Sequence, residues 1–254
     1  MRSPRALVVL LAGVGAAACG GGAANPNPTP TPKSGTLTVT PSDDTFINGR
    51  IPDNNNGASD SIFAGVDGQD GTMRGLLRFE MPTALQGATV TAVQLTMTLR
   101  ALGQGGPGPD VMLGLQAITE AWAQGNGIGA AGMSFTVGQS CSATVSGTTW
   151  NDTDCVGGTG TPWMVPGATV AAVMSGQADA TGLAVDSPLV WDGAAAGNAG
   201  MLADVQSWID SPGGNHGWRL TSSDEIAMAA AKRFYSSEAG GMTVPTLTIA
   251  YTHP

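Results

Sequence analysis

The sequence predicts an all-β protein, an antiparallel sandwich with one short helix, and three observations carry this prediction. Charged residues make up only 11% of the chain and glycine 38 of its 254 residues, which is unusual for a helical bundle and typical of short strands joined by tight turns. Apolar and polar residues alternate in about ten short segments, the spacing of half-buried strands. Helical spacing of apolar residues occurs in one segment near the C-terminus.

The clearest strand covers residues 90–102, where apolar side chains that should face the core alternate with polar ones. In residues 74–80 the same alternation directs Leu77 and Phe79 toward the core and Arg78 away from it. The inward side chains of the first segment are Val93, Leu95, Met97 and Leu99. Further strands are expected, in chain order, at residues 36–40, 61–66, 111–119, 168–174, 187–192, 217–222, 232–237 and 246–252.

The helical segment covers residues 198–210 and is expected to close one end of the sandwich. Met201, Val205 and Trp208 recur near helical spacing. Asn198 is suited to the N-cap position, and the Ser-Pro-Gly-Gly sequence that follows residue 210 ends the helix. The next residues, NHGWRL, then join the helix to a central strand.

The N-terminus resembles an export signal. Two arginines precede an apolar run that is too short to span a bilayer comfortably. The residues before Cys19 are three alanines, which resemble a bacterial lipobox with a lipid on Cys19; ordinary signal peptidase could also cleave after Ala18. We therefore expect a signal peptide at 1–18, a Gly/Pro-rich tether at 19–35 and the folded domain at 36–254, located at the bacterial cell envelope or secreted.

Cys141 and Cys155 remain after Cys19 is assigned. In an exported protein two such cysteines are expected to form a disulfide. The bridge would close a loop within the Gly-rich stretch from Trp122 to about Pro166, where strand patterns are weak. A metal site is a weaker reading of the pair, because no further thiol and no histidine lies near in the sequence.

Several segments occur in an order that resembles a known domain family. They are DDTFI, RGLLRFEMP, GATVTAVQLTMTLRA, ITEAWAQG, GTTWND, NHGWRL and KRFYSSEA. Over residues 36–252 the chain resembles the DNRLRE domain, which is related to the disaggregatase-type repeat and to carbohydrate-binding module family 96. The resemblance implies a non-catalytic β-sandwich of jelly-roll type, and some such domains bind acidic polysaccharides such as alginate. The longer central section with its cysteine pair departs from the family pattern.

Alternation places several candidate ligand-binding side chains on the sheet face that points away from the core. Guanidinium groups there can grip carboxylates or sulfates of a polysaccharide, because arginine forms bidentate pairs. Tryptophans in the rim loops can stack on sugar rings. An ordinary solvated face, with Arg78 and Arg233 paired to Glu80 and Glu238 and with the tryptophans as core or loop plugs, is the alternative. The candidates are Arg78, Arg219, Arg233, Tyr235, Trp122, Trp150 and Trp163.

Catalysis has little support in the sequence. His216 and His253 are the two histidines, and neither lies in a recognisable nucleophile motif. The 19 acidic residues leave a glycan-active carboxylate pair open, although spacing singles out none. No cofactor is expected apart from a structural Ca²⁺ ion, which oxygen-rich loops could hold. The alternative is that the aspartates in these loops only stabilise turns. The oxygen-rich loops that could hold this ion contain Asp43, Asp44, Asp67 and Asp70.

The formal net charge of −9 argues against nucleic acid as a partner, because phosphate binding requires a basic face. We therefore expect an exported, lipid-anchored, non-catalytic module that binds a polysaccharide, for example an acidic one, or another cell-envelope component at the cell surface. Its contact with the membrane would be made through the lipid anchor only. The alternative is a structural or adhesive surface or matrix protein with a protein partner and no glycan ligand.

Overall fold

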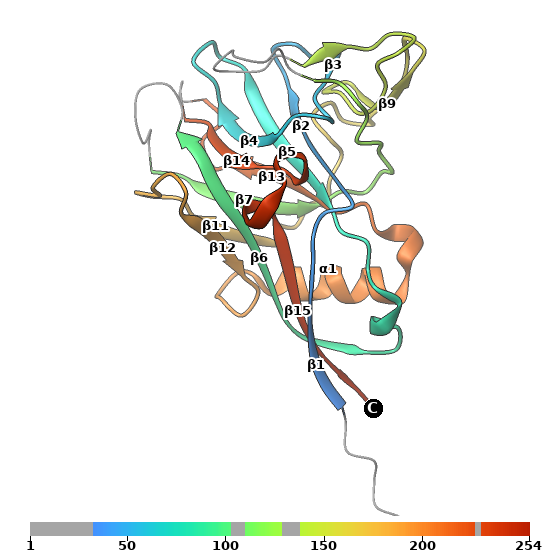
Figure 1. Ribbon diagram of the computed structural model, residues 1–254, viewed down its shortest axis with the longest axis vertical. Coiled ribbons are helices and arrows are strands. Elements are labelled where there is room, and N and C mark those ends of the chain that lie inside the picture. Colours follow the sequence, from blue (N-terminus) through green and yellow to red (C-terminus); the bar gives the residue numbers. More distant parts are fainter. Residues whose placement is uncertain (1–32, 103–109, 129–137, 227–229) are drawn as a thin grey trace, which may run out of the picture. The chain divides into compact units, whose positions relative to one another are not determined.

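The computed structural model describes residues 33–102, 110–128, 138–226 and 230–254 (Figure 1). The predicted signal peptide, the lipidation site at Cys19 and most of the tether lie outside these residues. The helical elements are α1 (Ala199–Asp210) and the 3₁₀ turns η1 (Thr83–Leu85), η2 (Pro212–Gly214), η3 (Ser237–Ala239) and η4 (Gly241–Thr243). The strands are β1 (Lys33–Val39), β2 (Asp43–Asn48), β3 (Asn54–Asn55), β4 (Ser61–Val66), β5 (Thr72–Arg78), β6 (Thr89–Leu102), β7 (Met112–Ala117), β8 (Gln139–Ser140), β9 (Asp152–Val156), β10 (Thr159–Pro162), β11 (Gly176–Asp179), β12 (Pro188–Asp192), β13 (Trp218–Ser222), β14 (Lys232–Tyr235) and β15 (Thr246–His253).

Most strands belong to one antiparallel sheet with the order β1-β15-β6-β14-β4-β5-β13-β7-β11. β12 also pairs with β6, and β2 pairs with β5, so the sheet branches at these two strands. The sheet curls until β6, β12 and β15 face β5, β7 and β13, and the main core fills the space between these two groups of strands (Figure 1). The predicted all-β antiparallel sandwich with one helix is confirmed.

The long strand β6 forms as its alternating sequence predicts. Val93, Leu95, Met97 and Leu99 are all buried in the main core, at 0–1% exposure. Their intervening neighbours are half-buried or exposed. The predicted strand at residues 61–66 forms with the same ends, and those at 187–192, 217–222, 232–237 and 246–252 form with one end shifted by one or two residues.

The segment predicted as a strand at residues 168–174 does not form one. Ala168 has a positive φ of 71°, a conformation that a regular strand does not contain. The segment instead follows the edge of β7 through separate bonds, with Ala171 N–H donating to Ala117 O at 2.8 Å and a single bridge between Ile118 and Val170. The regular strand β11 begins only at Gly176.

The helix α1 covers an end of the sandwich, where it packs against β6 and β11. Its buried side chains include Met201, Val205 and Trp208, as the helical spacing predicts. Asn198 stands at the N-cap position, but the predicted side-chain cap is absent. The Asn198 amide instead accepts Gln177 N–H at 2.8 Å and donates to Asp192 O at 2.9 Å. Asn198 therefore joins the start of the helix to β11 and to the end of β12.

Residues 118–170 contain an excursion that packs on the outer face of the sheet. The predicted disulfide between Cys141 and Cys155 is present within it. A second, smaller core lies between this excursion and the strands β2 and β5. Its buried residues are Ile47, Leu76, Ile118, Trp122, Trp163 and Ala168. The sheet face that carries Arg78 and Arg219 is therefore covered by protein over much of its area.

Among the residues that the structure describes, no helix has the length and apolar character needed to cross a membrane.

Candidate functional site

Arg78, on β5, is held by the neighbouring strand β2. The register of the two strands places Asp43 directly opposite Arg78. Arg78 donates to Asp43 Oδ2 from Nε at 2.9 Å and from Nη2 at 2.6 Å. Its guanidinium also lies 5.4 Å from the Trp122 ring, within the range of a cation–π contact. The partner of Arg78 is thus Asp43, and the alternative pairing with Glu80 is wrong.

Arg219, on β13, lies beneath the excursion rather than on a free face. Its Nη1 donates to Ala168 O at 2.8 Å and its Nη2 donates to Gln116 Oε1 at 2.7 Å. Burial, reinforced by the charge of Arg74, lowers the pKa of Arg219 to about 10. The carbonyl contacts indicate that Arg219 anchors the end of the excursion.

Arg233 and Tyr235, on β14, belong to a third group of side chains. Arg233 Nε donates to Ser61 Oγ at 2.8 Å, and its Nη2 lies 3.4 Å from Asp60 Oδ1. The Tyr235 hydroxyl donates to an Asp186 carboxylate oxygen at 3.2 Å. Arg78, Arg219 and Arg233 are therefore held by different partners, and the structure does not bring them together as one cationic patch. The alternative partner of Arg233, Glu238, is likewise not the residue that it contacts.

The tryptophans predicted to stack on sugars are mostly buried. Trp122 is 4% exposed and Trp163 is 3% exposed, so the expected exposure of these two rings is wrong. Each indole N–H donates to a backbone carbonyl, that of His216 at 2.8 Å for Trp122 and that of Thr149 at 3.1 Å for Trp163. Trp150 is half-buried, with the Arg74 guanidinium 4.7 Å from its ring.

The NHGWRL segment is a joint between the helix and β13. Asn215 Nδ2 donates to Phe79 O at 2.7 Å, and Gly217 adopts a positive φ of 75°. Trp218 is fully buried against the main core. Burial, together with the charge of Arg78, lowers the pKa of His216. In the part of the chain that the structure describes, the His216 imidazole makes no hydrogen bond.

The four aspartates considered for calcium serve different purposes. Asp43 pairs with Arg78, whereas Asp67 Oδ1 accepts the N–H groups of Gln69 at 2.8 Å and Gly71 at 2.7 Å. Asp67 thus fulfils the alternative role of turn formation. Asp70 is exposed in the same turn. Within the described ranges, no group of three His, Cys, Asp or Glu side chains could hold a metal ion.

Asp44 is a fully buried acid next to a second carboxylate. Its Oδ2 accepts Ser237 N–H at 2.9 Å, while its Oδ1 is buried without a hydrogen-bond partner. The Gln124 amide contacts both acidic residues: it accepts Asp44 N–H at 2.9 Å and donates to Glu238 Oε1. Burial and the nearby charge of Glu238 raise the pKa of Asp44 to about 8.

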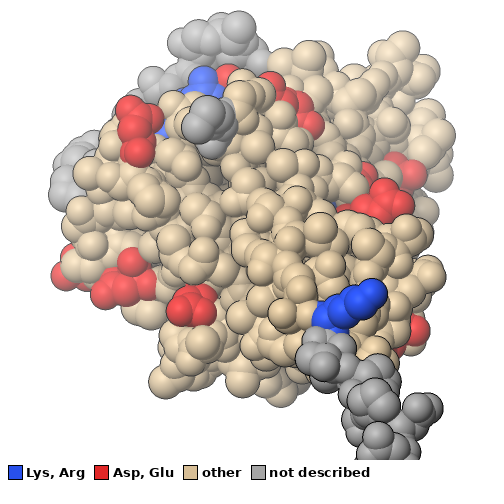
Figure 2. All heavy atoms as spheres, turned by 60° about the horizontal axis from the view of Figure 1, so that its bottom comes forward, with Lys and Arg blue, Asp and Glu red and all other residues tan. Residues whose placement is uncertain are grey.

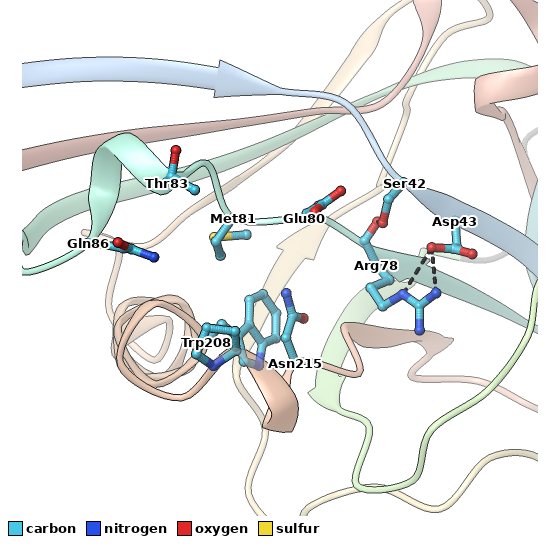
Figure 3. Close-up of a pocket in the computed structure, with 10 residues that line it drawn as sticks. Ser42, Asp43, Arg78, Glu80, Met81, Thr83, Gln86, Trp208 and Asn215 are labelled. Carbon is cyan, nitrogen blue, oxygen red and sulfur yellow. Dashed lines mark hydrogen bonds and ion pairs between the residues drawn. The ribbon is translucent and has the colours of Figure 1, made fainter.

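A groove of about 450 Å³ lies where β5, η1, the end of α1 and the NHGWRL joint meet (Figure 3). Trp208 and Asn215 lie on one side of it, and Glu80, Met81 and Thr83 lie on the other. Trp208 is only 4% exposed and packs on Trp218, with 4.6 Å between the ring centroids, so it forms a fixed apolar floor. The lining residues are Ser42, Asp43, Arg78, Glu80, Met81, Thr83, Gln86, Trp208, Pro212 and Asn215.

The groove has an apolar floor and a polar rim, with one ion pair on the rim. The Arg78 and Asp43 side chains are 28% and 22% exposed. Glu80 is exposed, and within the described residues it has no ion pair or hydrogen bond. Figure 2 shows acidic side chains scattered over one face of the molecule, with few basic ones between them.

Sequence reasoning identified only part of this groove. Arg78 was a predicted ligand contact, and Asp43 was considered only for a metal. Glu80 ends the alternating segment at residues 74–80 but was considered only as a partner of Arg78. Met81, Thr83 and Gln86 follow in a turn that carries no alternation, and Trp208 appears in the sequence as a core residue of the helix. Polar residues spaced through the segment directly after a predicted ligand contact, here Glu80, Thr83 and Gln86, are the signal that could have pointed to the rim.

The model of carbohydrate-binding module family 96 matches residues 35–128. This match supports the resemblance over the N-terminal part of the described domain. It contains the groove residues from Ser42 to Gln86, whereas Trp208, Pro212 and Asn215 lie outside it. A search of curated proteins finds no match to the chain.

Proposed function

We propose that this protein is a non-catalytic module that binds polysaccharide in the groove between Arg78, Glu80 and Trp208. The single observation that carries the proposal is the position of the groove. Seven of its lining residues lie in the segment that matches a carbohydrate-binding module family. The family match supplies the ligand class, and the groove supplies a place of suitable size and chemistry.

The chemistry of the groove suits a sugar. A sugar ring has apolar faces that lie against apolar side chains, and hydroxyl groups that both donate and accept hydrogen bonds. The Met81 and Pro212 side chains provide the accessible apolar contact, and Trp208, which is only 4% exposed, closes the floor of the groove beneath them. Arg78 uses three of its five N–H groups on Asp43 and on Trp122 O, which leaves two for a sugar oxygen.

We also propose where the protein is located and how it is anchored. We take residues 1–18 as a signal peptide, Cys19 as a lipidated residue and residues 19–35 as a tether, which would hold the module at the bacterial cell envelope. The positive segment, the apolar run and the small residues before Cys19 support this reading. Mass spectrometry of the membrane fraction tests it: a diacylglycerol-modified Cys19 is expected, and an unmodified soluble N-terminus would refute the anchor.

Calorimetric titration of the folded domain against laminarin, galactomannan and alginate tests the binding site. Gln86 is exposed on the rim, so Gln86→Trp fills the groove without disturbing the core. We expect this variant to lose affinity at least tenfold for the glycan that the wild type binds. The matched control is Gln69→Trp, at an exposed turn position outside the groove, which should bind as the wild type does.

The possible results separate the proposal from its alternatives. Equal affinity in Gln86→Trp and the wild type would place the binding site elsewhere on the domain. The absence of binding to all three glycans at millimolar concentration would refute the glycan-binding function and favour a structural or adhesive protein with a protein partner.

A further inference from the structure

We infer that the groove selects neutral glycans through the Glu80 carboxylate, and that it does not bind polyuronates through Arg78. This inference rests on the proposed function, because it names the ligand class of the same groove. Three observations carry it: the internal neutralisation of Arg78, the unpaired state of Glu80, and the uncharged character of the remaining rim.

Arg78 is the one cation among the residues that line the groove, and its charge is already matched. Two of its N–H groups donate to the same oxygen, Asp43 Oδ2, at 2.9 and 2.6 Å. A uronate carboxylate would have to replace Asp43 or bind beside it. In either arrangement two carboxylates compete for one guanidinium, so little net attraction remains.

Glu80 adds a negative charge that nothing in the described structure offsets. Its side chain is exposed and lines the groove without a hydrogen bond or ion pair. A carboxylate accepts only, so its natural partners are the hydroxyl donors of a neutral sugar, and two neighbouring hydroxyls can bind its two oxygens together. The same carboxylate repels a uronate.

The rest of the rim favours hydroxyl recognition as well. Ser42, Thr83, Gln86 and Asn215 are neutral groups that both donate and accept hydrogen bonds. Of the charged residues that line the groove, Asp43 and Arg78 cancel and Glu80 remains. The local charge thus has the same sign as the whole chain, whose formal net charge is −9, and both disfavour approach of a polyanion.

The other arginines predicted to bind an acidic ligand do not change this conclusion. Arg219 is occupied by backbone carbonyls beneath the excursion, and Arg233 is occupied by Ser61 and Asp60. Neither residue lines the groove. An acidic chain in the groove would therefore meet a single arginine that already carries a carboxylate.

Titrations of the wild type, Glu80→Gln and Asp70→Asn against laminarin, galactomannan and alginate test the inference. Asp70→Asn is the matched control, because it removes one exposed acidic charge outside the groove. For a neutral glycan we expect Glu80→Gln to weaken binding about tenfold, since an amide is a poorer acceptor than a carboxylate. We expect the affinity of the wild type to change less than twofold between about 50 and 500 mM NaCl.

The sign of the Glu80→Gln effect decides the ligand class. If the wild type binds alginate, if Glu80→Gln binds it more tightly, and if salt weakens that binding, the inference is overturned while the proposed function stands. If the wild type binds none of the three glycans, the proposed function itself fails. The role assigned to Glu80 is also overturned if a neutral glycan binds Glu80→Gln as tightly as it binds the wild type and the control Asp70→Asn.

Discussion

Asp43 Oδ2 accepts hydrogen bonds from both Nε and Nη2 of Arg78, at 2.9 and 2.6 Å. The antiparallel register of β2 and β5 fixes this pair, because it places the two residues directly opposite each other. The pair stands at the rim of the groove, where it presents a neutral ion pair rather than a free cation. Because the charge of Arg78 is already matched, the groove suits neutral sugars and is not a cationic patch for polyanions.

Removing the carboxylate of this pair should change the ligand preference. In Asp43→Asn the guanidinium of Arg78 loses its counter-charge, and the groove becomes more positive by one unit. We expect alginate binding to appear in this variant and to be weakened by salt. Stability should fall by at most about 1 kcal/mol, because both side chains are partly exposed. Calorimetry at two salt concentrations measures the first effect, and unchanged alginate affinity would show that Arg78 does not control ligand charge.

Trp122 should behave as a core residue of the second hydrophobic cluster. Trp122→Ala should lower the free energy of unfolding by about 3–5 kcal/mol, because it opens a cavity beneath the excursion. Trp122→Phe retains most of the packing but leaves the His216 carbonyl without its donor, and it should cost about 1 kcal/mol. Urea denaturation measures both changes. A loss below 1 kcal/mol in Trp122→Ala would contradict the buried role.

The disulfide should stabilise the excursion. It closes a loop with a sequence separation of 14 residues between Cys141 and Cys155. Replacing both cysteines with serine should lower the stability by about 3 kcal/mol in the chain-entropy account. Thermal unfolding of the double variant, compared with the oxidised wild type, measures this loss. A double variant that unfolds at the wild-type temperature would show that the loop is held by packing alone.

Stability should fall as the pH rises from about 4 to about 8, because of Asp44. Burial and the charge of Glu238 raise the pKa of Asp44 to about 8, above the value of about 3.9 expected in the unfolded chain. The folded state therefore binds this proton more tightly, and the resulting stability is present in full below about pH 4, declines as the pH rises toward about 8, and is gone above that pH. Thermal unfolding between about pH 4.5 and pH 8.5 should show this decline and its levelling off near pH 8.

Asp44→Asn tests the assignment of this pH dependence to Asp44. The amide resembles the protonated acid and keeps an acceptor for Ser237 N–H. The variant should lose most of the decline in unfolding temperature between about pH 4.5 and pH 8. A variant with the same slope as the wild type would attribute the effect to another group. Asp70→Asn, an exposed replacement, should retain the wild-type slope.

Most strands that could be predicted from sequence have one buried face. The exception is β4, which is buried throughout and was predicted as a short apolar run. β6 alternates because its apolar side chains enter the main core while the intervening ones stay accessible. β2 was missed as a strand, because five of its six residues are buried and no alternation arises. The failure at residues 168–174 has a local cause, since alternating apolar residues there follow a left-handed Ala168.

The candidate site was harder to predict because it depends on contacts between distant parts of the chain. Alternation correctly directed Arg78 and Arg219 away from the main core. It could not show that the excursion covers that face, nor that Asp43 lies opposite Arg78. The apolar floor of the groove comes from Trp208, which is distant in sequence from Glu80, so only the packing of α1 beside η1 reveals the groove.

Chemical-shift mapping of the isotopically labelled domain locates the surface that binds the glycan. The domain would be titrated with laminarin or galactomannan, whichever binds in the calorimeter. We expect the largest amide shifts around the groove, at Ser42, Glu80, Gln86 and Asn215. Shifts concentrated instead around Trp150 or Tyr235, or no shifts with any glycan, would contradict glycan binding in this groove.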